Sequence, residues 1–137
     1  MNQNVILISA GIVINENKQL LLVKKRGSAF YMQAGGKIES NETPVQALIR
    51  ELYEEVELTT SSKQFDYVGE FVTIAANEKD HLLKAHLFTL QVENQAIKAK
   101  AEIKIADWYT LEEAKQLCLA PLTKEIILPI VENLFSK

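Results

Sequence analysis

The sequence predicts an α/β (α+β) fold in which helices cover both faces of a central mixed β-sheet. Residues 5–14 form a nearly continuous apolar, β-branched run, which is typical of a strand buried on both faces. Residues 65–76 and 82–92 alternate apolar and polar side chains, as strands with one solvated face do. Apolar residues recur at helical spacing over 44–56 and again from Thr123, which predicts helices that cover a sheet.

The composition indicates one domain over residues 1–137, since 137 residues at 47% hydrophobic can form a core of their own. A net charge of −3 and a pI of about 5.5 argue against a nucleic-acid polymer as partner, because such binding usually needs a basic surface. A small anionic substrate bridged by a metal ion remains compatible with this charge.

The segments that would target or cross-link the protein are few. Cys118 is the only cysteine, so no intrachain disulfide is expected, which suits a cytoplasmic location. We expect it to be a small packing residue. No apolar stretch has the length of a transmembrane helix, and no basic region precedes the first apolar run. We therefore expect neither a membrane partner nor a signal peptide.

The chain opens with a predicted hairpin. The strand over 5–14 is followed by turn residues at 15–18 and a second apolar strand over 19–23. The basic run 24–26 ends this strand and has two interpretations. It is an ordinary charged strand end, or its cations contact substrate phosphates. In the second case Arg26 is favoured, because a guanidinium makes bidentate contacts with phosphate.

A short strand over 30–33 is expected to lead into a glycine loop over 34–37, with the sequence Ala-Gly-Gly-Lys. Two consecutive glycines let the backbone turn tightly and approach a ligand closely. Phe30 and Lys37 stand at the two ends of this segment and are candidate substrate-binding residues.

The next helix has a well-specified start. Thr43 can cap it, Pro44 suits its first position, and Gln46 completes a Thr-x-x-Gln capping box. One face of this helix carries the apolar residues Val45, Leu48, Ile49, Leu52 and Val56. That stripe predicts that the helix packs against the sheet.

Three glutamates of the same helix, Glu51, Glu54 and Glu55, gather on a patch away from the apolar stripe. Their carboxylates repel one another, and Arg50 is the only basic residue on the helix. One interpretation is a solvated helix face. The other is a site for a hard divalent cation such as Mg²⁺, which takes oxygen ligands and would relieve the repulsion.

Residues 35–58 resemble the Nudix box, G-x(5)-E-x(7)-R-E-U-x-E-E-x-G-U, where U is a bulky aliphatic residue. Glu57 stands where the box has its second glycine; that glycine helps the chain leave the helix, so the departure concerns the exit more than the chemistry. The matching positions are Gly36, Glu42, Arg50, Glu51, Leu52, Glu54, Glu55 and Leu58. The resemblance implies a MutT-like Nudix hydrolase and the α/β/α Nudix sandwich.

The resemblance also implies roles for the site residues. Glu51, Glu54 and Glu55 would hold one or more Mg²⁺ ions, with Mn²⁺ as a substitute, and one of them would activate the attacking water. Which glutamate is the base differs across the family. A backbone carbonyl of the glycine pair would also bind the metal, and Gly35 matches that position. Arg50 would orient the carboxylates.

The following two strands, 65–76 and 82–92, are predicted to be joined by a loop over 77–81. His81 and His86 lack the ligand spacing of a zinc site and are interpreted as structural. The loop also carries Glu78, a weaker candidate for the active site.

The C-terminal region begins with a predicted strand over 103–109. Its Trp108 is either a core residue, which we favour, or a platform for base stacking. A Thr-x-x-Glu capping box opens a helix over about 110–117. The final helix starts at Thr123 and should be kinked or broken near Pro129, which cannot donate a backbone hydrogen bond.

Glu102 lies in the loop that enters the strand over 103–109. MutT-type enzymes carry an extra acidic metal ligand or base at the matching place, so Glu102 is a candidate catalytic and metal-binding residue. The alternative is a solvated loop glutamate between Lys100 and Lys104.

The resemblance implies hydrolysis of a nucleoside diphosphate linked to another moiety by attack of water. MutT-type (d)NTP pyrophosphohydrolases, which release NMP and pyrophosphate, are the most similar in sequence pattern. Thr123 is the nearest match to the asparagine with which those enzymes read the base, and a hydroxyl cannot replace both groups of an amide. We therefore expect loose base specificity.

Two alternatives to this function stay open. The first is hydrolysis of ADP-ribose or dinucleoside polyphosphates. The second is a non-catalytic nucleotide-binding sensor, which would be expected to have a broken glutamate cluster or a fused regulatory domain. In each case the partner is a small nucleotide, and the protein is a monomer or homodimer.

Overall fold

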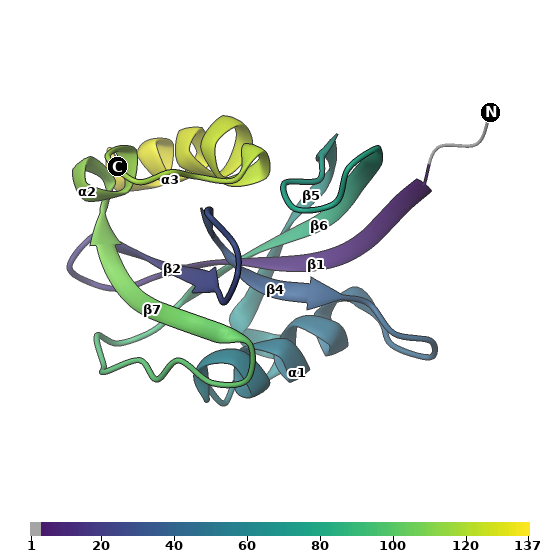
Figure 1. Ribbon diagram of the computed structural model, residues 1–137. Helices are drawn as coiled ribbons and strands as arrows, with labels where there is room; N and C mark the ends of the chain where they lie inside the picture. Colours follow the sequence, from purple (N-terminus) through teal and green to yellow (C-terminus); the bar gives the residue numbers. More distant parts are fainter. Residues whose placement is uncertain (1–3) are drawn as a thin grey trace.

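The computed structural model describes residues 4–137 and contains a seven-stranded sheet with helices on both of its faces (Figure 1). The domain predicted over 1–137 includes residues 1–3, which lie outside the described part of the chain. The strands are β1 (Asn4–Ile14), β2 (Gln19–Lys25), β3 (Tyr31–Met32), β4 (Ala34–Lys37), β5 (Phe65–Ile74), β6 (His81–Gln91) and β7 (Ile103–Thr110). The helical segments are α1 (Pro44–Val56), a 3₁₀ turn (Ser62–Gln64), α2 (Leu111–Lys115), a π-helical turn (Thr123–Ile127) and α3 (Leu128–Phe135).

The sheet is mixed, as the sequence predicted. Its strand order is β3-β2-β1-β6-β5, with β4 paired to β1 and β7 paired to β2. The predicted hairpin of β1 and β2 is antiparallel, with Ile14 opposite Leu20. The pairing of β1 with β6 is parallel along the whole strand. None of the helices within residues 4–137 is long and apolar enough to cross a membrane.

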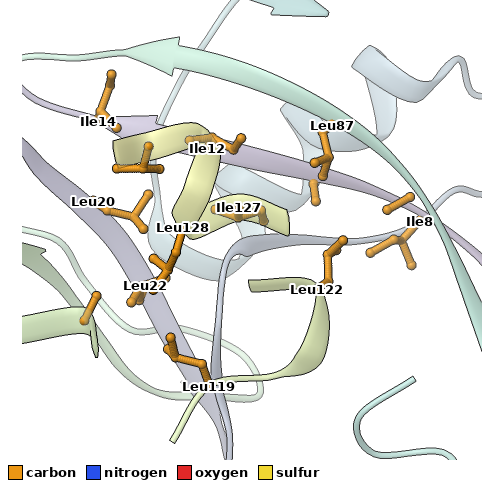
Figure 2. Close-up of a cluster of buried hydrophobic side chains, with 14 residues drawn as sticks. Ile8, Ile12, Ile14, Leu20, Leu22, Leu87, Leu119, Leu122, Ile127 and Leu128 are labelled. Carbon is orange, nitrogen blue, oxygen red and sulfur yellow. The ribbon is translucent and has the colours of Figure 1, made fainter. Parts of the chain in front are cut away.

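The two faces of the sheet each carry a core. Helices α2 and α3 cover the first face, where Ile127 and Leu128 pack against Ile12 and Leu22 (Figure 2). Helix α1 covers the second face with residues such as Leu48. Side chains of a strand alternate between faces, so β1 contributes to both cores. Burial on both faces is confirmed for the second half of β1.

The first residues of β1 differ from the prediction of a fully buried strand. Val5 is 55% exposed and Leu7 is 42% exposed. Both lie beside the outer strands β6 and β5, where the register places Val72 and Ile74 next to them, and these side chains are exposed too. Helix α1 packs mainly on β4 and the later part of β1, so it does not reach this end of the sheet.

Helix α1 begins and ends as its sequence requires. The Thr43 hydroxyl accepts a hydrogen bond from the Gln46 backbone N–H, and the Gln46 side chain accepts one from the Thr43 N–H, which confirms the capping box. At the exit, Glu57 has a φ of 57°, the left-handed conformation that the box glycine would adopt freely. Its carboxylate pairs with Lys98 and Lys100 at 3.4 and 3.3 Å. The exit geometry is therefore kept without the glycine.

The glycine segment was expected to be a loop, and the structure corrects this: Ala34–Lys37 is strand β4, paired antiparallel with β1. Gly35 lies opposite Ala10 with a φ of 139°, and a Cβ built on it would lie 2.8 Å from the Ala10 Cα. The glycine therefore permits close strand contact rather than a turn. Strand β3 is shorter than predicted and excludes Phe30.

The C-terminal helix is interrupted near Pro129, as predicted. A π-helical turn precedes α3, with the Leu128 N–H bonded to the Thr123 carbonyl, and Pro129 is the second residue of α3. Helix α2 ends at Lys115 rather than near residue 117. Cys118 is exposed, so the prediction that it is a packing residue is wrong, because the chain has already left the helix there.

Candidate active site

Strand β4 and helix α1 meet at Glu55. The Gly35 N–H donates a hydrogen bond of 3.0 Å to Glu55 Oε1. The side chain is 1% exposed, whereas its helical position alone predicted a patch away from the core. The difference arises because β4 lies against this part of α1. Among the described residues, Glu55 Oε2 has no hydrogen-bond partner.

The electrostatics of the site follow from this burial. Loss of solvation raises the pKa of Glu55 to about 8, while the Gly35 N–H opposes the shift and the Glu51 carboxylate adds to it. Burial also raises the pKa of Glu51, against the lowering effect of Arg50. A buried carboxylate with one unpaired oxygen needs either a proton or a cation.

Arg50 donates hydrogen bonds to three carboxylates and one backbone carbonyl. Its Nε and Nη2 donate to the two Glu42 oxygens at 2.7 and 2.9 Å, and its Nη1 donates to Glu51 and Glu54 at 2.9 and 2.8 Å. Nη2 also donates to the Lys37 carbonyl at 3.0 Å. The bidentate pair lowers the pKa of Glu42 to about 2 and raises the pKa of Arg50.

The glutamates line one open pocket of about 420 Å³. Glu102 faces α1 across this pocket, and its loop is tied down on both sides. The Arg26 N–H donates to the Glu102 carbonyl at 2.8 Å, and the Lys100 N–H donates to the Glu55 carbonyl at 2.9 Å. The pocket is lined by Glu51, Glu54, Glu55, Lys100, Ala101 and Glu102.

The donor chemistry of this pocket fits a hard divalent cation, since carboxylate oxygens line it and one of them is buried without a partner. Within residues 4–137, no three His, Cys, Asp or Glu side chains are already arranged to hold a metal ion. Glu51 and Glu54 are instead paired with Arg50. Gly36 brings the backbone close, because a Cβ there would lie 2.5 Å from the Glu51 carboxyl group.

A second pocket, of about 130 Å³, has Gly35 and Gly36 of the glycine strand among its lining residues. It is mostly apolar. We call it the β4 pocket. Its polar lining residues are Lys25, Gln33, Lys37, Asn77 and Glu78, and its apolar ones include Ile6, Ile8, Met32, Leu83, Pro121 and Leu122.

Three predicted substrate-binding residues do not line either pocket. Arg26 is exposed and Phe30 is half-buried. Thr123 is fully buried and donates a hydrogen bond of 2.6 Å to Gln33 Oε1. Lys37 does line the β4 pocket, and its ammonium lies 3.9 Å from the Glu78 carboxylate.

Gln33 was not predicted from the sequence, and the structure places Lys25 rather than Arg26 at the β4 pocket. Lys25 lines the β4 pocket, and its charge acts on Glu55. A signal for Gln33 existed in the sequence, since a polar side chain directly before Ala-Gly-Gly faces whatever the glycines approach.

Trp108 packs against the second core and donates from Nε1 to the Gln95 carbonyl at 2.8 Å, as expected of a core residue.

Comparison with known proteins places this site in a family. The model of the NUDIX domain matches residues 6–129, which is most of the chain. The chain belongs to the Nudix family. Its glutamate helix, glycine strand and mixed sheet are thus the Nudix fold predicted from the box.

Curated relatives of this Nudix chain differ in how much they align. The 8-oxo-dGTP diphosphatase of Escherichia coli (strain K12) is 43% identical over 56 residues, 38% of this chain and 43% of that protein. The dihydroneopterin triphosphate diphosphatase of Haemophilus influenzae (strain ATCC 51907 / DSM 11121 / KW20 / Rd) is 28% identical over 97% of this chain and 89% of that protein. The matched part spans about half the length of the 8-oxo-dGTP diphosphatases, 43% and 61% of two of them.

Solved Nudix structures share the fold. The MutT protein from Methanosarcina mazei Go1 superimposes with a TM-score of 0.79 at 18% identity, over 100% of this chain and 99% of that one. This likeness supports the α/β/α sandwich and its placement of α1 against the sheet.

Proposed function

We propose that this Nudix protein is a Mg²⁺-dependent pyrophosphohydrolase that cleaves a nucleoside diphosphate linked to another moiety. The preferred substrate class is a (d)NTP, with NMP and pyrophosphate as products. Nudix hydrolases generally need divalent cations. Mg²⁺ is proposed here because the donors are carboxylate oxygens, and Mn²⁺ is expected to substitute for it.

The observation that carries this proposal is the state of Glu55. Its carboxylate is 1% exposed, has an unpaired oxygen, and borders a pocket with three further glutamates. A structural glutamate on a helix face would not be buried in this way, because isolated burial of a carboxylate is costly. A divalent cation compensates this cost and, when bound, neutralises the pyrophosphate and lowers the pKa of water.

The chain's own residues have distinct proposed roles. Glu51, Glu54 and Glu55 would hold the cation with the Gly35 carbonyl, and Arg50 orients Glu51 and Glu54 through its two hydrogen bonds. Glu102 approaches from the facing loop as a further ligand or as the base that takes the proton of the attacking water. The remaining substrate contacts are assigned to the β4 pocket and its Lys25 and Lys37.

The site also supports the partner and compartment that the sequence predicted. The net charge of −3 offers no basic surface for a nucleic-acid backbone, which usually needs one. A small nucleotide is therefore the proposed partner of a monomer or homodimer. The exposed thiol of Cys118 is consistent with a reducing cytoplasm, where such groups persist.

Release of phosphate and pyrophosphate from a panel of compounds with Mg²⁺ tests the proposal. The panel follows the names of the relatives, which include an 8-oxo-dGTP diphosphatase, a dihydroneopterin triphosphate diphosphatase and an ADP-ribose pyrophosphatase. Turnover of a (d)NTP to NMP supports the proposal. Turnover of ADP-ribose alone would show that the substrate class is ADP-ribose rather than a (d)NTP. Nucleotide binding without any turnover would support a sensor.

A further inference from the structure

The β4 pocket contains one polar side chain that is both buried and held in a fixed orientation. Gln33 is 6% exposed and lines the pocket, and its Oε1 accepts the 2.6 Å hydrogen bond from the Thr123 hydroxyl. Thr123 itself has no exposed surface. The two residues lie 90 positions apart in the sequence, so the fold brings them together.

The hydrogen bond between Thr123 and Gln33 determines which group of the Gln33 amide is available to a ligand in the β4 pocket. A carboxamide has an acceptor oxygen and a donor NH₂ group. The Thr123 hydroxyl binds the oxygen, which leaves the Nε2 hydrogens of Gln33 as the group available to a ligand. Most of the other lining residues are apolar, such as Ile8 and Leu122, so a hydrogen bond from Gln33 forms in a poorly solvated space.

The β4 pocket is also placed to receive the base end of a nucleotide. Gly35 and Gly36 line it, while Gly35 binds Glu55 and Gly36 approaches Glu51 on the side of the carboxylate pocket. Lys25 lies at the same pocket and offers a cation to the phosphates between the two. A nucleotide whose phosphates reach the glutamates can thus extend its base past the glycine pair toward Gln33.

We propose that Gln33, oriented by Thr123, determines base specificity by donating a hydrogen bond to a carbonyl oxygen of the base. The protein then prefers keto bases to amino bases. This inference rests on the proposed function and adds the class of base to it. One such bond is worth about tenfold in kcat/KM, since a net hydrogen bond contributes roughly that factor.

The test uses substrate pairs that present either a carbonyl oxygen or an amino group at one ring position, dITP against dATP and dUTP against dCTP. The full-length protein is assayed with Mg²⁺. Wild type should prefer the keto member of both pairs by about tenfold. Gln33→Leu should reduce both ratios to within about twofold, and Gln33→Glu, which offers an acceptor, should favour the amino member.

Variants of Thr123 test whether its hydroxyl orients Gln33, as distinct from supporting the fold. Thr123→Val keeps the shape but removes the hydroxyl, so it should weaken the keto preference, while Thr123→Ser retains the hydroxyl and should retain the preference. Wild-type ratios near one would overturn the inference. It would also be overturned if the ratios were unchanged in Gln33→Leu and Thr123→Val, or if Asn77→Ala removed the preference while Gln33→Leu did not.

Failure of the proposed function is distinguishable from failure of this inference. If none of the four nucleotides is hydrolysed, the proposed (d)NTP substrate class fails, and dissociation constants of the same nucleotides with Mg²⁺ replace the rates. A keto preference in binding that Gln33→Leu abolishes supports the inference. Equal dissociation constants within each pair overturn it.

Discussion

The backbone N–H of Gly35 donates a 3.0 Å hydrogen bond to Oε1 of the buried Glu55, and so joins strand β4 to helix α1 at the carboxylate pocket. The other oxygen of this carboxylate has no partner within residues 4–137. The glycine strand and the glutamate helix are therefore joined directly at the carboxylate pocket.

Replacing single glutamates of α1 should separate chemistry from stability. We expect Glu54→Gln and Glu55→Gln each to lower kcat by roughly 10²-fold or more, because each removes a metal-binding or proton-accepting oxygen. The melting temperature should change little, since Glu54 is exposed and a glutamine at 55 resembles the protonated acid. Glu112→Gln, on the exposed surface of α2, is the matched control. Full activity in both variants, or in excess EDTA, would refute the site.

Glu102 should behave as a functional residue although it lies in a loop. We expect Glu102→Gln to reduce kcat by roughly 10²-fold or more. A titration with Mg²⁺ distinguishes its two proposed roles, because added metal restores a lost ligand but not a lost base. The neighbouring Lys104→Gln is a control for loop charge. If the kcat of the Glu102 variant is within about twofold of wild type at every Mg²⁺ concentration, Glu102 is a solvated loop residue without a catalytic role.

The metal-free protein should lose stability as the pH rises. The pKa of Glu55 is about 8 in the folded state against 4.5 for the ordinary group, so the folded state binds the extra proton between these values. Its contribution is fully present below about pH 4.5 and is lost as the pH passes through 8. In EDTA, thermal unfolding should occur at a lower temperature at pH 8.5 than at pH 6.

Two comparisons test whether Glu55 causes this dependence of stability on pH. Glu55→Gln cannot titrate and should remove most of the pH dependence over this interval. Mg²⁺ should raise the melting temperature more at pH 8.5 than at pH 6, because it binds the ionised form. An identical slope in the variant and the wild type would show that other groups cause it.

Base specificity should be real but modest. Discrimination by 10⁴ or more requires several buried polar groups that go unpaired with the wrong ligand. Thr123 does not line the β4 pocket, and Gln33 offers it one buried amide. We therefore expect kcat/KM values for 8-oxo-dGTP, dGTP, dCTP and ADP-ribose to differ by less than 10⁴. A single compound preferred beyond that margin would show that the pocket offers further recognition groups besides Gln33.

The sequence predicted features whose causes are local. The capping box of Thr43 and Gln46 involves neighbours in the chain, and the apolar stripe with Leu48 reports the period of a helix, so α1 was placed correctly. The alternation in residues 65–76 likewise predicted β5. Patterns of this kind can be recognised in the sequence because a few adjacent residues determine them.

Features that depend on distant contacts could not be predicted. Gly35 and Gly36 look like a turn in isolation, and only the pairing with β1 makes them a strand. The burial of Glu55 requires β4 to lie against α1. Thr123 was matched to a ligand-binding position, but its hydroxyl points to Gln33, far away in the chain. No short window of sequence contains both partners of such a contact.

The parallel pairing of β1 with β6 constrains the order in which the protein can assemble. Asn4 lies opposite His81, so the two strands pair only when residues 77 positions apart in the sequence are both available. The residues of helix α1 are available much earlier, and before the sheet forms its glutamates are still in water. Glu102 joins them only when β7 docks on β2, close to the end of the chain. A growing chain that ends before Glu102 would therefore carry the motif without the complete carboxylate pocket.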